Sequence, residues 1–135
     1  MAEFSLHEAL DADTVEAVRW PLCRVLLMND RSYPWLILVP ARANKTEIHD
    51  LDPADQSLLM AEIDRASRAL SQLYAPHKIN VAAIGNMVPQ LHIHVVARFR
   101  TDAAWPGPVW GAHPPRPYET ADLDEVLDLL RQALD

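Results

Sequence analysis

Apolar residues recur along the chain first with the period of strands and then with that of helices. Two apolar, branched runs at 22–28 and 35–39 flank a segment with turn chemistry, which predicts a hairpin that ends at Pro40. Between residues 52 and 76, apolar side chains recur at intervals of three and four behind an Asp-Pro pair. This is the clearest helix in the sequence.

Weaker patterns complete the expected order of elements. The runs 79–84 and 91–99 predict two more strands, and an apolar stripe predicts a last helix capped by Thr120 or Asp122. A short helix is also expected from Asp13 to Trp20. Strands that follow a long helix favour an α+β fold with an antiparallel sheet.

Size and composition favour one compact unit. The 135 residues suffice for one core, so we expect a single domain over 1–135. Half of the residues are apolar and 23% are charged, which is typical of a globular protein. The segment 102–117 holds five of the eleven prolines and two of the four tryptophans, which predicts an ordered loop or a linker.

Charge and apolar content restrict the partners. The net charge of −7 argues against broad capture of nucleic acid, although a small phosphorylated ligand needs only a few local donors. No apolar run reaches the roughly 18 residues that cross a bilayer, and the N-terminus lacks the pattern of a secretion signal. Cys23 is the single cysteine, so an intrachain disulfide is excluded. We expect a cytoplasmic protein that binds neither membranes nor nucleic acid.

Two histidines alternate with apolar residues in the strand predicted at 91–99. Because side chains of a strand alternate between faces, one face carries Gln90, His92, His94 and Arg98. The other face is apolar and is expected to pack inward. The polar face therefore concentrates two imidazoles and a guanidinium.

Spacing alone leaves alternatives to a catalytic role for these histidines. They could be polar side chains on an open sheet face, or ligands of zinc, because histidines at i and i+2 can bind this metal. Zinc takes three or four ligands, and folding could bring in His49, His77 or His113.

The run 90–96, Gln-Leu-His-Ile-His-Val-Val, resembles the signature of the histidine-triad (HIT) family, His-φ-His-φ-His-φ-φ with φ apolar. Gln90 stands in the place of the first histidine. The similarity covers about residues 22–99 and includes three upstream segments: 27–31, 34–40 and 48–51. It implies a HIT-like fold, with an antiparallel sheet of about five strands, one long helix packed on it, and a C-terminal helix beyond the motif in 100–135.

The resemblance implies roles for three side chains of the motif. His92 corresponds to the nucleophile that attacks the α-phosphorus and forms a covalent nucleotidyl-histidine, which water resolves. His94 would lie against the phosphate and the leaving group and help to protonate the latter. Gln90 cannot titrate, yet its amide could hold an imidazole in one tautomer.

Further residues are expected to contact substrate. The resemblance places Asn86 at the phosphate and Asn29 at the ribose, and it places Trp35 where many relatives carry a supporting histidine. Gly85 would let backbone N–H groups approach phosphate, or it forms an ordinary turn. Arg98 would neutralise phosphate charge, or it is simply solvated.

The resemblance implies a nucleotide hydrolase or nucleotidyl transferase that acts on a phosphoramidate, a phosphoanhydride or a dinucleoside polyphosphate. It also implies a homodimer formed by joining sheets, with no required metal, although magnesium bound to substrate can help. The missing first histidine motivates an alternative, a nucleotide-binding or regulatory module with little turnover. The tryptophans of the segment 105–113 could stack on a base, although packing of the loop is favoured.

Overall fold

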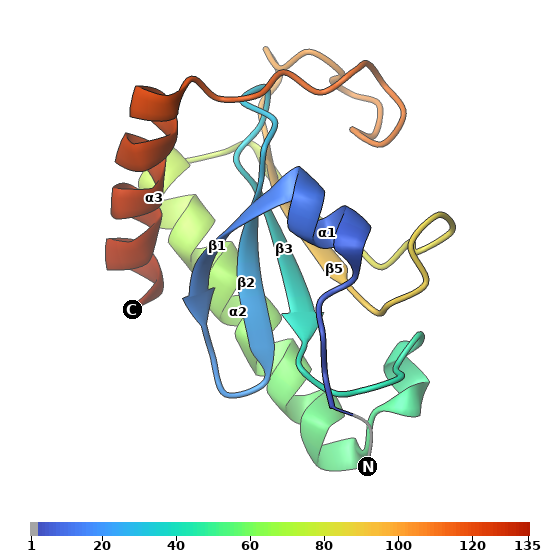
Figure 1. The fold of residues 1–135 in the computed structure, drawn as a ribbon. Coiled ribbons are helices and arrows are strands. Elements are labelled where there is room, and N and C mark those ends of the chain that lie inside the picture. The colour runs from blue at the N-terminus through green and yellow to red at the C-terminus, as the bar shows by residue number, and fades with distance from the viewer. Residues whose placement is uncertain (1–2) are drawn as a thin grey trace.

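The computed structural model describes residues 3–135, which form a five-stranded antiparallel sheet and three α-helices (Figure 1). The helices are α1 (Glu8–Asp13), α2 (Pro53–Tyr74) and α3 (Thr120–Leu134), with a 3-10 turn η1 (Ile48–Asp50) before α2. The strands are β1 (Thr14–Arg19), β2 (Cys23–Met28), β3 (Trp35–Pro40), β4 (Lys78–Ala82) and β5 (Ile93–Arg98). The predicted α+β class and the five-stranded antiparallel sheet are confirmed.

The strand with the histidine motif lies inside the sheet. The strand order is β1-β2-β3-β5-β4, so β5 pairs with β3 on one side and with β4 on the other. His94 lies opposite Ile37 of β3 and opposite Ala82 of β4. Pairing on both sides fixes the register of β5, and therefore the direction in which its side chains point.

One face of the sheet packs against α2 and α3 (Figure 1). The Asp52 side chain accepts a hydrogen bond from the Asp55 N–H, and Pro53 begins α2, as the sequence predicts. The apolar stripes of α2 and α3 are buried against the sheet; their fully or nearly fully buried residues include Leu59, Ala66, Leu70, Leu127, Leu130 and Leu134. The main core lies between these helices and the sheet.

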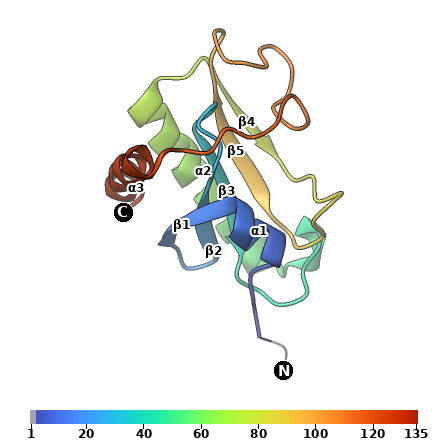
Figure 2. The same cartoon turned by 45° about the horizontal axis from the view of Figure 1, so that its top comes forward.

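The opposite face is covered too, so the alternative of polar side chains on an open sheet face does not hold. Leu10 of α1 and Val109 of the 102–117 loop pack with Tyr33 and Trp35 in a second apolar cluster. Figures 1 and 2 show α1 on the side of the sheet away from α2, and the loop crossing the end of the sheet. Every residue of β5 is consequently buried.

Two local predictions are wrong. The helix expected from Asp13 to Trp20 is instead the strand β1, which follows directly on Asp13, the last residue of α1; pairing with β2 and burial of Ala17 decide the conformation of this segment. The residue that precedes α3 is Glu119, so Thr120 is the first helical residue and Asp122 lies within the first turn. Within residues 3–135, no helix has the length and apolar character needed to span a bilayer.

Candidate active site

His92 and His94 lie side by side at the start of β5. Their ring centroids are 4.9 Å apart and the ring planes are inclined by 70°. Each residue is only 6% exposed. The loop between β4 and β5 leads the chain to His92, and β5 then holds His94 in the sheet.

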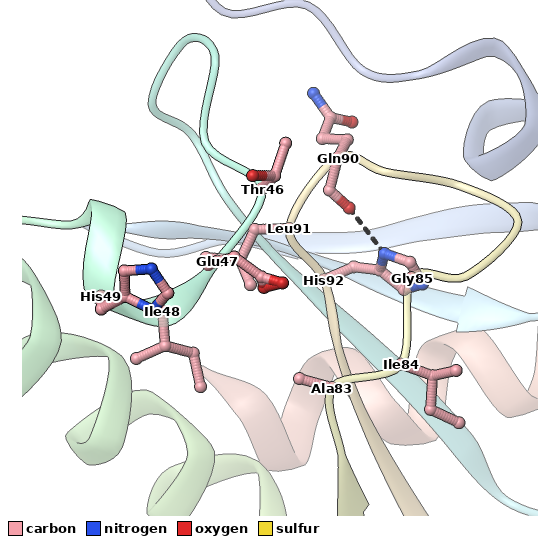
Figure 3. Close-up of a pocket in the computed structure, with 10 residues that line it drawn as sticks. All are labelled: Thr46, Glu47, Ile48, His49, Ala83, Ile84, Gly85, Gln90, Leu91 and His92. Carbon is pink, nitrogen blue, oxygen red and sulfur yellow. Dashed lines mark hydrogen bonds between the residues drawn. The ribbon is translucent and has the colours of Figure 1, made fainter.

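A backbone carbonyl fixes the tautomer of His92. The His92 Nδ1 atom lies 2.7 Å from the Gln90 carbonyl oxygen (Figure 3). Because a carbonyl oxygen only accepts hydrogen bonds, Nδ1 carries the proton. In the neutral ring, Nε2 then has a free electron pair, which is the form that a nucleophile requires.

The Gln90 side chain acts elsewhere, which corrects the expectation that its amide holds an imidazole. Its Oε1 accepts a hydrogen bond from the His7 N–H at 2.8 Å, and its Nε2 donates to the Ser5 carbonyl at 2.9 Å. Figure 3 shows the amide pointing away from His92. Gln90 therefore orients His92 through its main chain and anchors the N-terminal segment through its side chain.

His94 has the opposite tautomer. The Trp35 indole Nε1–H donates to His94 Nδ1 at 3.0 Å, so the proton of the neutral ring is on Nε2. Burial, together with the neighbouring His92, lowers the pKa of His94 from 6.5 to about 4. At neutral pH the His94 ring is consequently neutral, and its Nε2–H is a hydrogen-bond donor. A neutral ring does not transfer a proton to a leaving group.

Aromatic rings surround His94. Trp110, from the 102–117 loop, packs edge-on against His94 at 5.2 Å and against Trp35 at 6.3 Å between centroids. Sequence reasoning did not find the role of Trp35 as a hydrogen-bond donor. The available signal was its place in the strand that pairs with β5, where an indole can reach the histidine face of the sheet.

His92 lines two cavities. The first cavity has a volume of about 250 Å³ and is lined by the turn 46–49, by Ala83 and by Ile84, and Figure 3 shows it. The second cavity, of about 210 Å³, is lined by Asn86, His94 and Trp110. Gly85 lines both cavities.

Gly85 and Asn86 line a cavity together with His92, and their contact with phosphate stays a prediction. Gly85 has φ +68°, and a Cβ built on it would lie 3.2 Å from the Val88 carbonyl oxygen. This left-handed conformation and the close approach both favour glycine. Asn86 lines the second cavity beside both histidines.

Two more cavities continue from the second one along the histidine face. His94 and Trp110 also line a third cavity of about 250 Å³, together with Trp35 and His113. Met28 and Pro115 join this third cavity to a fourth, of about 220 Å³, which Asn29 lines. Asn29 thus lies two cavities away from His92, and its Oδ1 accepts a hydrogen bond from the Tyr118 N–H at 2.9 Å.

Arg98 is neither solvated nor directed into the cavities of His92, which corrects both expectations for it. The residue is 2% exposed, and its guanidinium forms an ion pair of 2.8 Å with Asp102. The same group donates to the Gly107 carbonyl and to the Asn80 side chain. Arg98 therefore holds the base of the 102–117 loop.

The aromatic residues of this loop divide between packing and lining. Trp105 packs near Arg98 and His77, as an anchor of the loop. Trp110 and His113 line the cavities beside His94, and the His113 ring stacks on Tyr33. Trp105 therefore follows the packing interpretation, whereas stacking of Trp110 on a base stays a prediction.

The part of the chain that the structure describes provides no set of zinc ligands. Among residues 3–135, no group of three or more His, Cys, Asp or Glu side chains is close enough to hold a metal ion. His113 contacts Tyr33, and His77 contacts Arg100 and Trp105. The zinc interpretation therefore finds no support in this geometry.

Comparison with known proteins identifies the family. The sequence pattern of the HIT domain matches residues 11–101. A histidine triad protein from Bradyrhizobium japonicum is 45% identical with a TM-score of 0.96, over 99% of this chain and 100% of that chain. One from Marinobacter aquaeolei VT8 is 46% identical with a TM-score of 0.96, over 98% and 97% of the two chains.

A curated relative carries a functional name. The AP-4-A phosphorylase of Mycobacterium tuberculosis (strain H37Rv) is 35% identical over 81 residues. The match covers 53% of this chain and 41% of the relative, so it spans less than half of that protein. With the domain pattern matched over most of its length and with close structural relatives, the chain belongs to the HIT domain family.

Proposed function

We propose that this protein is a nucleotide hydrolase or nucleotidyl transferase in which His92 Nε2 attacks the α-phosphorus of the substrate. The observation that carries the proposal is the 2.7 Å contact between His92 Nδ1 and the Gln90 carbonyl, which places the proton of the neutral ring on Nδ1 and its free electron pair on Nε2. Family membership supports it, as does the name of the relative, AP-4-A phosphorylase.

The proposed reaction has two steps at phosphorus. In the first, the Nε2–P bond forms while the bond from phosphorus to the leaving group breaks, and the leaving group takes a proton from water. In the second, water attacks the phosphorus, the electron pair of the Nε2–P bond returns to His92, and a proton passes to solvent. His92 keeps its Nδ1 proton throughout, and the Gln90 carbonyl stabilises the positive charge of the nucleotidyl-imidazolium.

Neighbouring groups would bind the phosphoryl oxygens. The Nε2–H of His94 is available because Trp35 occupies its other nitrogen. Asn86 and the backbone around Gly85 would supply further donors from the β4–β5 loop. We propose no protein-bound metal as cofactor; magnesium would reach the site bound to substrate phosphates.

The nucleoside half of the substrate fits the aromatic side of the site. We place the base in the third cavity, between Trp35, Trp110 and His113, because aromatic side chains stack on nucleobases. The cavity adjoins the histidines through His94 and Trp110. Gln90, in the place of the first triad histidine, would then serve as an anchor rather than as an acid or base.

Release of AMP tests the proposal. Purified protein is incubated with an adenosine phosphoramidate and with a diadenosine polyphosphate, beside His92→Ala and the control His77→Ala, which lies outside the cavities of the site. We expect turnover that falls at least about a thousandfold in His92→Ala and is retained in His77→Ala. Tight nucleotide binding without turnover by the unaltered protein would instead favour a nucleotide-binding module.

A further inference from the structure

The first cavity reaches His92 from a different side than the second. Of these two cavities, the second and not the first is lined by His94 and Trp110, whereas the first and not the second is lined by the turn 46–49 and Ala83. If the nucleoside half occupies the aromatic side, the first cavity remains beside the reacting phosphorus for the other half of the substrate. An attack in line with the departing bond needs such a second space.

The charges around this cavity disfavour a phosphate in it. Among the residues described, no Lys or Arg lines the first, second or third cavity. Glu47 lines the first cavity, and Figure 3 shows its carboxylate directed toward the side where His92 lies. A departing pyrophosphate or nucleoside polyphosphate would place several negative charges beside Glu47, with no Lys or Arg in the lining of the cavity.

A second carboxylate adds to the negative charge of the turn. Asp50 Oδ2 accepts hydrogen bonds from the Thr46 N–H, the Thr46 hydroxyl and the Glu47 N–H. These bonds lower the pKa of Asp50, so its carboxylate remains ionised at neutral pH. The same bonds hold the turn that carries Glu47 in place.

Resting on the proposed function, we propose that the first cavity is the subsite of the departing group and that Glu47 selects an alkylamine with a second, positively charged amino group. The bond that breaks is then P–N, and the departing nitrogen takes a proton from water as His92 Nε2 bonds to phosphorus. Ile48 and Ile84, each 43% exposed, line the same cavity and offer apolar walls for the alkyl stem. The carboxylate of Glu47 pairs with the terminal ammonium.

Three substrates with the same AMP half test this subsite. The AMP phosphorus is joined to 1,4-diaminobutane through one nitrogen, to butylamine, or to phosphate as ADP, and kcat/KM is measured for each. Glu47→Gln should lower kcat/KM for the diaminobutane compound roughly two- to fivefold, which is the size of effect expected for an exposed ion pair. The kcat/KM for the butylamine compound should not change. Glu47→Lys should lower kcat/KM for the diaminobutane compound further and raise kcat/KM for ADP.

A control variant and the possible contrary results distinguish failure of the proposed subsite from failure of the proposed nucleophile. Glu125→Gln removes an exposed carboxylate on α3 and should change none of the three values. Equal effects of Glu47→Gln on all three substrates, or none on the diaminobutane compound, would overturn the subsite while leaving the nucleophile intact. If the unaltered protein releases AMP from none of the three, the proposed function itself fails and the subsite with it.

Discussion

At the scale of single residues, the two histidines are held in opposite tautomers, one by a hydrogen-bond acceptor and the other by a donor. The carbonyl of Gln90 sets the proton of His92 on Nδ1, and the indole of Trp35 sets that of His94 on Nε2. The alternation of the motif predicts that both side chains share one face of a strand. It does not predict either partner, because one is a main-chain atom and the other comes from a neighbouring strand.

Without the Trp35 N–H, the His94 ring should no longer be held in a single tautomer. We expect Trp35→Phe to keep an aromatic ring in the second apolar cluster while His94 Nδ1 loses its donor at 3.0 Å. Nitrogen NMR shifts of the His94 ring should then show a mixture of tautomers, and kcat should fall more than KM rises. An unchanged tautomer in Trp35→Phe would show that the indole does not position His94, whereas Trp35→His, which can still donate, should restore part of the order.

The pKa of His94 predicts how stability depends on pH. The folded protein protonates this ring only near pH 4, whereas the unfolded chain does so near the ordinary value of 6.5. The unfolded state therefore binds the extra proton between these values, so stability is complete above about pH 6.5 and falls as pH is lowered toward 4. The loss reaches at most roughly 3 kcal/mol.

Urea unfolding of the unaltered protein and of His94→Asn measures this contribution. The difference in the free energy of unfolding between the two proteins should narrow as pH falls from about 6.5 to 4 and then stay constant. A difference that does not vary with pH in this range would mean that His94 titrates normally in the folded protein.

At the scale of elements, the sequence predicts the regular parts of the fold and misses how the loops are held. The periods of the apolar residues suffice for β2, β3, α2 and α3, because their buried stripes are long. The short segment that forms α1 and β1 is predicted wrongly, since pairing with β2 outweighs its local preference. The 102–117 loop is predicted as a loop, but its attachment depends on Arg98, whose partners lie outside any periodic pattern.

The ion pair between Arg98 and Asp102 should be the main anchor of the 102–117 loop. Both side chains are almost fully buried, at 2% and 4% exposed, so Asp102→Ala leaves a buried, unpaired guanidinium. We expect a loss of about 3–5 kcal/mol in the free energy of unfolding and faster amide hydrogen exchange in the loop. Asp64→Ala is the control, because the Asp64–Arg68 pair is exposed and should contribute much less to the free energy of unfolding. Equal losses in the two variants would contradict the anchoring role.

At the scale of the whole molecule, the two edges of the sheet differ. Arg131 of α3 donates to the Ala17 and Glu16 carbonyls of β1, so part of that edge is already occupied. The edge strand β4 pairs only with β5 among the residues described, and its Val81 is 48% exposed. An unpaired edge with exposed apolar residues can add a further strand.

The homodimer stays a prediction, and its place should be the β4 edge. Light scattering should give the mass of two chains for the unaltered protein and of one chain for Val81→Pro, because proline removes a backbone donor from the edge. Leu129→Lys changes an equally exposed apolar residue on α3 and should remain dimeric. A single-chain mass of the unaltered protein at all concentrations would contradict the prediction.

Detection of a nucleotide attached to His92 would identify this residue as the nucleophile. The protein is mixed with an adenosine phosphoramidate, quenched within one turnover in alkaline denaturant, where phosphorus–nitrogen bonds of histidine persist, and digested for mass spectrometry. We expect the mass of one AMP moiety on the peptide that contains His92, and its absence in His92→Ala. Release of AMP without this adduct, or an adduct on another residue, would show that His92 is not the nucleophile.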